Sequence, residues 1–207
     1  TGTKFFIMTP SLFIIALIIL IVVIIIKEFK GINLSDIFES PKKRAGRYGE
    51  AFATNAIKSV LRENDLLFTN VQISYNGKPA ELDNVVVNKY GVFIIEVKNY
   101  NGKLSGTEDD YEWQKFHTTY SGNTYVKAVK NPIKQVKRQV YILAKFLDYY
   151  GTRVRVKGFA FLVNQNSPVN SEYILSDTND IDRAIHTSGR NLLNKATVEA
   201  ISKLLSD

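Results

Sequence analysis

The stretch ELDNVVVNKYGVFIIEVKN, residues 81–99, decides how this chain folds. It contains two runs rich in β-branched residues, 81–87 and 92–98, separated by Asn-Lys-Tyr-Gly. Runs of this kind favour strands, and the short break between them favours a tight turn. We therefore predict an antiparallel strand pair in which Val87 lies opposite Val92.

The predicted register places charged residues opposite each other at the far end of this pair. Asp83 falls opposite Glu96, with their Cβ atoms about 4.5–5.5 Å apart. Lys98 shares the face of Glu96, because side chains alternate along a strand. Two adjacent carboxylates repel each other unless a cation lies between them, and oxygen ligands suit Mg²⁺ or Mn²⁺. Glu81 falls opposite Lys98 in the same register, so an ordinary cross-strand ion pair is the alternative interpretation.

Periodicity and turn signals organise the chain on either side of this pair. The strand that ends at Tyr75 runs into Asn76-Gly77, which is typical of a hairpin turn. Asn131-Pro132 is typical of a helix start, and Gly151 of a helix end. The predicted elements are helices at 49–62, 132–150 and 192–205, strands at 71–75, 81–87, 92–98 and 154–163, and short strands near 111–116 and 124–126. This order predicts an α/β fold, with a mixed sheet flanked by helices.

The N-terminal part has a different composition. Residues 5–26 are twenty-two residues without a charge, long enough to cross a hydrocarbon core of about 30 Å as a helix. A cleaved signal peptide is the alternative, but the apolar stretch is long and no small-residue cleavage site follows it. Lysine and arginine are concentrated in the basic linker that follows, residues 27–47. We therefore predict a single-pass membrane protein whose α/β domain, residues 48–207, lies in the cytoplasm.

Composition restricts the chemistry. The chain has no cysteine, which excludes disulfides, thiol nucleophiles and cysteine-ligated metals. Its two histidines, His117 and His186, match no metal-binding spacing, so any metal must be held mainly by oxygen ligands. The net charge of +7 and the isoelectric point near 9.4 favour an anionic partner, either nucleic acid or a lipid surface.

Several short motifs occur together in the soluble part. They are Gly49-Glu50, Glu81-Leu82-Asp83, Gly91-Val92-Phe93, Glu96-Val97-Lys98-Asn99, Gly102, Asn131-Pro132 and Gln135. In order and spacing this set resembles the nuclease-related domain, a branch of the PD-(D/E)xK nuclease superfamily, over about residues 46–140. Each motif alone is weak, whereas the set is specific.

This resemblance implies a restriction-endonuclease-like fold and a role for each site residue. Asp83 and Glu96 would be the metal-binding acidic residues and Lys98 the catalytic lysine. Glu50 would be an additional acidic residue near the metal, and Gln135 a polar residue at the rim of the site. Glu50 precedes Ala53 by three residues, which places it on the apolar side of the first helix, although stabilisation of the helix N-terminus explains it equally well.

The resulting hypothesis is a membrane-anchored, metal-dependent nuclease that hydrolyses nucleic-acid phosphodiesters, DNA rather than RNA, with bound Mg²⁺ or Mn²⁺. Aromatic residues Trp113, Phe116 and Tyr120 either stack on bases or pack internally. The alternative is a non-catalytic membrane-tethered module that binds nucleic acid or protein. A basic cluster either tracks the phosphate backbone or forms a solvated helix face, and it consists of Lys127, Lys130, Lys134, Lys137 and Arg138.

Overall fold

The computed structural model describes Ile19 and residues 40–119, 121–187 and 192–206. The chain divides into two compact units, Thr1–Arg44 and Ala45–Asp207. The predicted membrane segment and most of the predicted linker lie outside the described residues. Within the described part of the chain, no helix is both long and apolar enough to cross a membrane.

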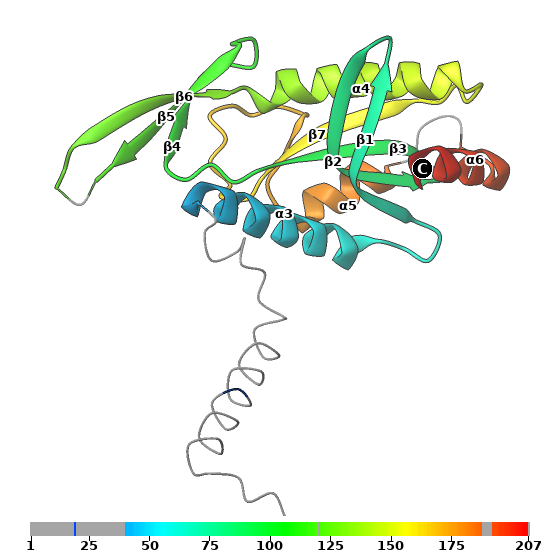
Figure 1. Ribbon diagram of the computed structural model, residues 1–207, viewed down its shortest axis with the longest axis horizontal. Helices are drawn as coiled ribbons and strands as arrows, with labels where there is room; N and C mark the ends of the chain where they lie inside the picture. The colour runs from blue at the N-terminus through cyan, green and yellow to red at the C-terminus, as the bar shows by residue number, and fades with distance from the viewer. Residues whose placement is uncertain (1–18, 20–39, 120, 188–191, 207) are drawn as a thin grey trace, which may run out of the picture. The chain divides into compact units, whose positions relative to one another are not determined.

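The second unit is built on a five-stranded mixed sheet with the strand order β1-β2-β3-β7-β8. β1, β2 and β3 pair antiparallel, whereas β3, β7 and β8 pair parallel (Figure 1). The described elements are α3 (Pro41–Val60), β1 (Leu66–Tyr75), β2 (Lys78–Asn88), β3 (Gly91–Lys98), β4 (Lys103–Ser105), β5 (Glu112–Thr118), β6 (Thr124–Lys130), α4 (Pro132–Tyr149), β7 (Val156–Leu162), β8 (Ile174–Leu175), α5 (Thr178–His186) and α6 (Lys195–Ser206).

Helices cover both faces of this sheet. β3 shows why, since Val92 and Ile94 point into a core shared with α4 and α6, whereas Phe93 and Ile95 point into a core shared with α3 and α5. All four side chains are at most 1% exposed. A strand that is apolar on both sides must be covered on both sides. The predicted mixed sheet flanked by helices is therefore confirmed.

Two of the predicted local signals have the expected geometry. Asn76 and Gly77 both have positive φ, as the tight hairpin turn between β1 and β2 requires. Asn131 caps α4, because its side chain accepts a hydrogen bond from the backbone N–H of Ile133, with Pro132 in the first helical turn.

Other elements differ from the prediction. α3 begins at Pro41, eight residues before the predicted start at Gly49, with proline at the first helical position, where it is tolerated. Of the predicted apolar stripe on α4, Ile133, Val136, Val140, Leu143, Leu147 and Tyr150, the last is exposed, and Gln139 and Ile142 are buried instead. β4, β8 and α5 were not predicted, since they are too short for periodicity to stand out.

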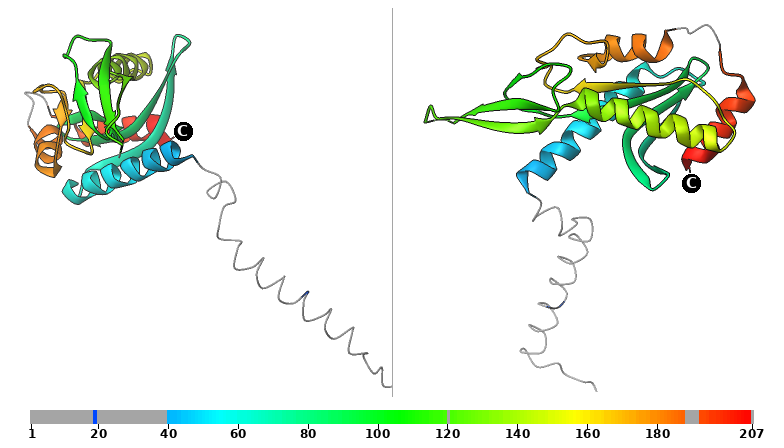
Figure 2. Two further views of the ribbon diagram at one scale, coloured as in Figure 1. Left: turned by 90° about the vertical axis from the view of Figure 1, so that its left-hand side faces the viewer. Right: turned by 90° about the horizontal axis from the view of Figure 1, so that it is seen from above.

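A second sheet, of β4, β5 and β6, extends away from the first (Figures 1 and 2). We call residues 103–130 the arm. Only its root is buried, where Leu104 and Trp113 pack against α4 and β7. Gly102, the residue before the arm, has a positive φ, and a Cβ atom there would collide with the carbonyl oxygen of Phe116, so only glycine fits this position.

Candidate active site at the fork between β2 and β3

The two central strands separate at the predicted site. The register agrees with the prediction from Val87–Val92 to Asn84–Ile95, where regular pairing ends. The predicted pairs Asp83–Glu96 and Glu81–Lys98 are therefore wrong as ladder pairs, because β2 continues with β1 alone and Glu81 pairs with Gln72.

A distortion in β1 accompanies the separation. Asn70 has a positive φ, a left-handed conformation that is uncommon for a residue with a side chain, and it falls in the register gap opposite Asp83. A left-handed residue inside a strand bends it and interrupts its ladder. The interruption leaves the Asp83 side chain free to turn toward β3.

Beyond Ile95, where β2 no longer pairs with β3, the side chain of Asp83 supplies the hydrogen-bond acceptor for β3. Its Oδ2 accepts a hydrogen bond of 2.7 Å from the backbone N–H of Val97, the residue between Glu96 and Lys98. That N–H points toward the gap left by β2 and needs an acceptor there. The carboxylate of Asp83 therefore lies beside Glu96 by a side-chain-to-backbone contact instead of by strand register.

Glu96 is 2% exposed and is surrounded by donors. Its Oε1 accepts hydrogen bonds from the Lys98 ammonium and, at 2.6 Å, from Nε2 of Gln135. Its Oε2 accepts one of 2.6 Å from Nε2 of Gln139. A buried carboxylate is tolerated only with such partners. The predicted residues Glu96, Lys98 and Gln135 are thus in direct contact, and Gln135 belongs to the site itself.

Gln139 is a site residue that the sequence analysis missed. It is 2% exposed, and its Nε2 also donates to the carbonyl oxygen of Glu81 at 2.9 Å, so it bridges α4, β2 and β3. Its Oε1 is buried and has no hydrogen-bond partner among the described residues. Its position four residues after Gln135, on the same helix face, was the available signal.

The electrostatics of the site follow from burial and crowding. Burial raises the pKa of Asp83 to about 7, with the Glu96 charge adding to this and the Val97 N–H and Lys98 opposing it. For Lys98, burial lowers the pKa, but the charge and hydrogen bond of Glu96 outweigh it and raise the pKa above its usual range. Lys98 therefore stays protonated at neutral pH, whereas the carboxyl of Asp83 gains or loses its proton near pH 7.

Glu50 lies at the edge of the site. The buried stripe of α3 runs through Gly49, Ala53 and Ile57, so the expectation that Glu50 projects on the apolar side is wrong, and Glu50 is exposed. The glycine of the Gly49-Glu50 motif is needed for packing, because a Cβ atom at Gly49 would lie 2.8 Å from Cβ of Asn99. The Glu50 charge still raises the pKa of Asp83, as the weakest of its causes.

Tyr100 connects the site to the arm. Its hydroxyl donates a hydrogen bond of 3.1 Å to the carbonyl oxygen of Lys130, the last residue of β6. Burial raises its pKa, Lys98 lowers it and Glu96 raises it, so the phenol shares the electrostatic environment of the site. No motif pointed to this residue, since a tyrosine after a strand carries no specific signal.

We call the site formed by Asp83, Glu96, Lys98, Gln135 and Gln139 the fork. Its residues fit a divalent cation with oxygen ligands. Asp83 and Glu96 supply carboxylates, and the carbonyl of Val97 lies on the same strand edge as its N–H. Burial and, after it, the Glu96 charge raise the pKa of Asp83, and a bound cation would oppose both effects by favouring the ionised carboxylate. The described residues contain no group of three or more His, Asp or Glu side chains able to hold a metal, so a cation here depends on these two carboxylates.

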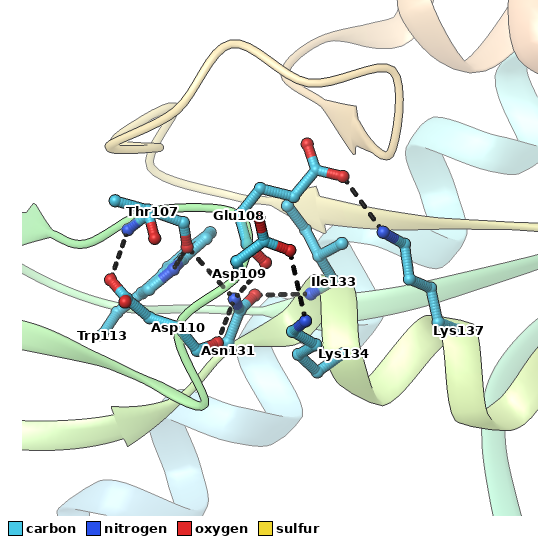
Figure 3. Close-up of polar contacts among 9 residues, drawn as sticks. All are labelled: Thr107, Glu108, Asp109, Asp110, Trp113, Asn131, Ile133, Lys134 and Lys137. Carbon is cyan, nitrogen blue, oxygen red and sulfur yellow. Dashed lines mark hydrogen bonds and ion pairs between the residues drawn. The ribbon is translucent and has the colours of Figure 1, made fainter.

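The predicted basic cluster is divided by the structure. Nζ of Lys134 lies 3.5 Å from Asp109, and Nζ of Lys137 lies 3.1 Å from Glu108 (Figure 3). Arg138 donates to the carbonyl oxygen of Pro79. The three members of the cluster on α4 thus have partners within the protein, whereas Lys127 and Lys130 are exposed on the arm.

Asn131 holds the loop that contains Glu108, Asp109 and Asp110, here called the acidic loop, against α4. Its Nδ2 donates to the carbonyl oxygens of Thr107, Glu108 and Asp110 at 3.3, 3.0 and 2.7 Å (Figure 3). Nε1 of Trp113 donates to the same Thr107 carbonyl at 2.8 Å.

Trp113 is fully buried, so it packs and does not stack on bases. Phe116 is partly buried, and Tyr120 lies outside the described residues.

Fold and site together define a class, the mixed-sheet α/β proteins with a nuclease-like arrangement of two acidic residues and a lysine at a strand end. The family model described as "Nuclease-related domain" matches residues 45–163, which contain every residue of the fork. The chain belongs to this family.

Two further comparisons add little about function. The chain is 26% identical over 106 residues to an uncharacterized protein of Bacillus anthracis, a match that covers 45% of this chain and 49% of the relative. The chain thus spans about half the length of the curated relative that it matches. No solved structure matches the chain.

Proposed function

We propose that this protein is a metal-dependent nuclease that hydrolyses phosphodiester bonds in nucleic acid, DNA rather than RNA. The observation that carries the proposal is the fork, where Asp83, Glu96 and Lys98 meet in a buried, charged environment at the end of an apolar strand. Perturbed, closely coupled acids in such a setting are typical of catalytic sites.

In this proposal Asp83 and Glu96 hold Mg²⁺ or Mn²⁺, and Glu50 contributes from the edge of the site. The bound cation supplies Lewis-acid polarisation of the scissile phosphate and a water of lowered pKa. Gln135 and Gln139 keep the Glu96 carboxylate in one orientation through its two oxygens. Lys127 and Lys130 on the arm contact the phosphate backbone.

Lys98 acts as a cation and not as a base. Glu96 raises the pKa of Lys98, so its ammonium keeps its proton at neutral pH. In the proposed reaction the ammonium donates hydrogen bonds to the phosphoryl oxygens and offsets the charge that develops on them.

A second candidate is a binding module that uses the same fold without catalysis. One observation favours it, because both oxygens of Glu96 are already engaged by Lys98, Gln135 and Gln139. A cation has to compete with these donors for Glu96. Metal binding therefore separates the two candidates.

The test is titration of Mg²⁺ and Mn²⁺ into the full chain by calorimetry, with cleavage of labelled DNA and RNA in parallel. We expect binding and metal-dependent cleavage in the wild type and neither in Asp83→Asn. Asp148→Asn, an exposed carboxylate on α4, is the matched control. Wild-type protein that neither binds metal nor cleaves would favour the binding module.

Membrane anchoring through residues 5–26, with the domain in the cytoplasm, remains a prediction from the sequence. It is tested by membrane fractionation of cells that produce the full chain, followed by protease treatment of sealed vesicles. Recovery of the chain in the soluble fraction would contradict it.

A further inference from the structure

The outer half of the arm carries positive charge without internal compensation. Between Trp113 and Lys130 the sequence contains no aspartate or glutamate. Lys115 and Lys127 belong to this segment, and no ion pair of either is recorded within the described residues. Lys134, Lys137 and Arg138 on α4 differ, since each of these three has an acceptor in the protein.

The strand register gathers these groups on one face. Lys115 pairs directly with Lys127, and the next position on that face, toward the tip, pairs His117 with Tyr125. Like charges opposite each other destabilise a strand pair. Since this arrangement opposes the folding of the arm, it is better explained by an anionic partner than by stability.

The arm beyond its root also contributes little to the core. Every residue from Thr124 to Ala128 is exposed, and Tyr125 and Val126 are 60% and 55% exposed. The right-hand view of Figure 2 shows the hairpin extending well away from the rest of the domain. A strand of the length of β6 is long enough to follow several consecutive phosphates along one DNA strand.

The arm is joined to the fork at its root. In the chain it lies between β3, which ends at Lys98, and α4, which carries Gln135. The Tyr100 hydroxyl bonds to the carbonyl oxygen of Lys130 and ties the end of β6 to the neighbourhood of Lys98. A polyanion that lies along the arm is thereby led toward the site.

We propose that the arm is a guide for nucleic acid, in which Lys115 and Lys127 contact consecutive parts of the phosphate backbone and Tyr125 lies against the sugar or base. The contacts are independent of base sequence, because they are made to phosphates. This inference rests on the proposed function, since it names the surface that delivers substrate to the fork. An anionic lipid surface has the same charge, but the connection to the fork through Tyr100 favours nucleic acid.

The test compares two double variants of the full chain in which the same charge is removed. Lys115→Gln with Lys127→Gln changes the arm, and Lys195→Gln with Lys203→Gln changes exposed lysines of α6. Binding of a fluorescent DNA duplex is followed by anisotropy between about 50 and 200 mM salt. The slope of log affinity against log salt should fall by about 2 in the arm variant and stay unchanged in the α6 variant.

A further variant separates binding from folding. Lys127→Glu places a carboxylate opposite Lys115, which favours the hairpin while it repels phosphate. We expect this variant to melt no lower than the wild type and to bind DNA more weakly than the double variant. An unchanged salt slope in the double variant, or a loss of binding to phosphatidylserine vesicles in place of DNA, would overturn the proposal.

Calorimetry with Mg²⁺ alone distinguishes a failure of this proposal from a failure of the proposed function. An arm variant that binds Mg²⁺ like the wild type but DNA weakly supports both. A wild type that binds DNA through the arm but binds no Mg²⁺ refutes the nuclease and leaves the guide in place as part of a binding module.

Discussion

Lys98 at the fork and Lys127 on the arm show two uses of the same side chain. The Lys98 side chain is 18% exposed and bonded to Glu96, whereas Lys127 is exposed and its cross-strand neighbour is another lysine. At the fork Glu96 is paired with Lys98, whereas the outer half of the arm, residues 114–129, has no acidic residue to pair with its lysines. Charges that are paired inside a protein hold geometry, and charges left unpaired on its surface are available to a partner.

The difference also concerns what each region does to stability. At the fork, Glu96 is buried and Asp83 is half-buried, at an energetic cost that their hydrogen-bond partners and a cation reduce. On the arm, Lys127 is exposed and Lys115 half-buried, and neither has an ion pair among the described residues, so we expect their removal to leave the fold intact. Substitutions at the fork are therefore expected to change chemistry or stability, and those on the arm to change binding.

The largest expected effect is at Lys98. Lys98→Ala removes the only ammonium bonded to Glu96 among the described residues, and should lower metal-dependent cleavage by about 100- to 1000-fold. Steady-state cleavage of labelled DNA measures this, with circular dichroism as the check on folding. Lys58→Ala, an exposed lysine of α3, should cleave like the wild type. Full activity in Lys98→Ala would place the catalytic site elsewhere.

Next in size is Gln139. Gln139→Met keeps the length of the side chain but leaves Glu96 Oε2 and the Glu81 carbonyl without their donor, and should lower the free energy of unfolding by about 1–3 kcal/mol. Urea denaturation measures the change. Gln72→Met on exposed β1 should change stability little. If both variants are equally stable, Gln139 does not hold the fork together.

Asp83 should link stability to pH. The pKa of Asp83 is raised by burial to about 7 in the folded chain, above the ordinary value of 3.8, so the folded state binds the extra proton and stability should fall as pH rises from about 4 to 7. In the presence of a chelator, Asp83→Asn should therefore be more stable than the wild type at pH 8, by about 1–2 kcal/mol, and similar to it near pH 4.

Thermal melts at these two pH values check the Asp83 prediction. Mg²⁺ should raise the melting temperature of the wild type and leave that of Asp83→Asn unchanged, because only the wild type has the carboxylate. A wild type whose stability does not depend on pH in this window would mean that the pKa of Asp83 is not raised in the folded chain.

The smallest effect is expected on α4. Lys134→Gln with Lys137→Gln removes the two ion pairs to the acidic loop, which are solvent-exposed and add little to stability. Because these lysines are already engaged, we expect the salt slope of DNA binding to change less than in the arm variant. A change as large as that of the arm variant would place α4 on the nucleic-acid path and remove the contrast between the two regions.

The local elements were predictable because each rests on near neighbours. The Asn76-Gly77 turn, the Asn131 cap and the register from Val87 to Asn84 depend on residues a few positions apart. Motif resemblance then placed Asp83, Glu96, Lys98 and Gln135 together before any contact was known.

The contacts that complete the site were not predictable in this way. Extending the strand register by one step wrongly paired Asp83 with Glu96 in the ladder, because the pairing of β2 with β3 ends at Asn84 and Ile95, and Asn70, on a third strand, interrupts the pairing of β1 with β2 opposite Asp83. Gln139 and Tyr100 carry no distinctive pattern, and their roles come from partners 43 and 30 residues away.

The sequence by itself determined the order of the longer helices and strands, the family and the residue types of the site, since these depend on local periodicity, turn chemistry and motif spacing. Only the tertiary structure decided which charges are neutralised within the protein and which stay free. That outcome depends on distances between segments far apart in the chain, such as Glu108 and Lys137 across the acidic loop or Lys115 and Lys127 across the arm. All these lysines contribute equally to the net charge, but their burial and their neighbours differ, and these decide which of them are paired within the protein.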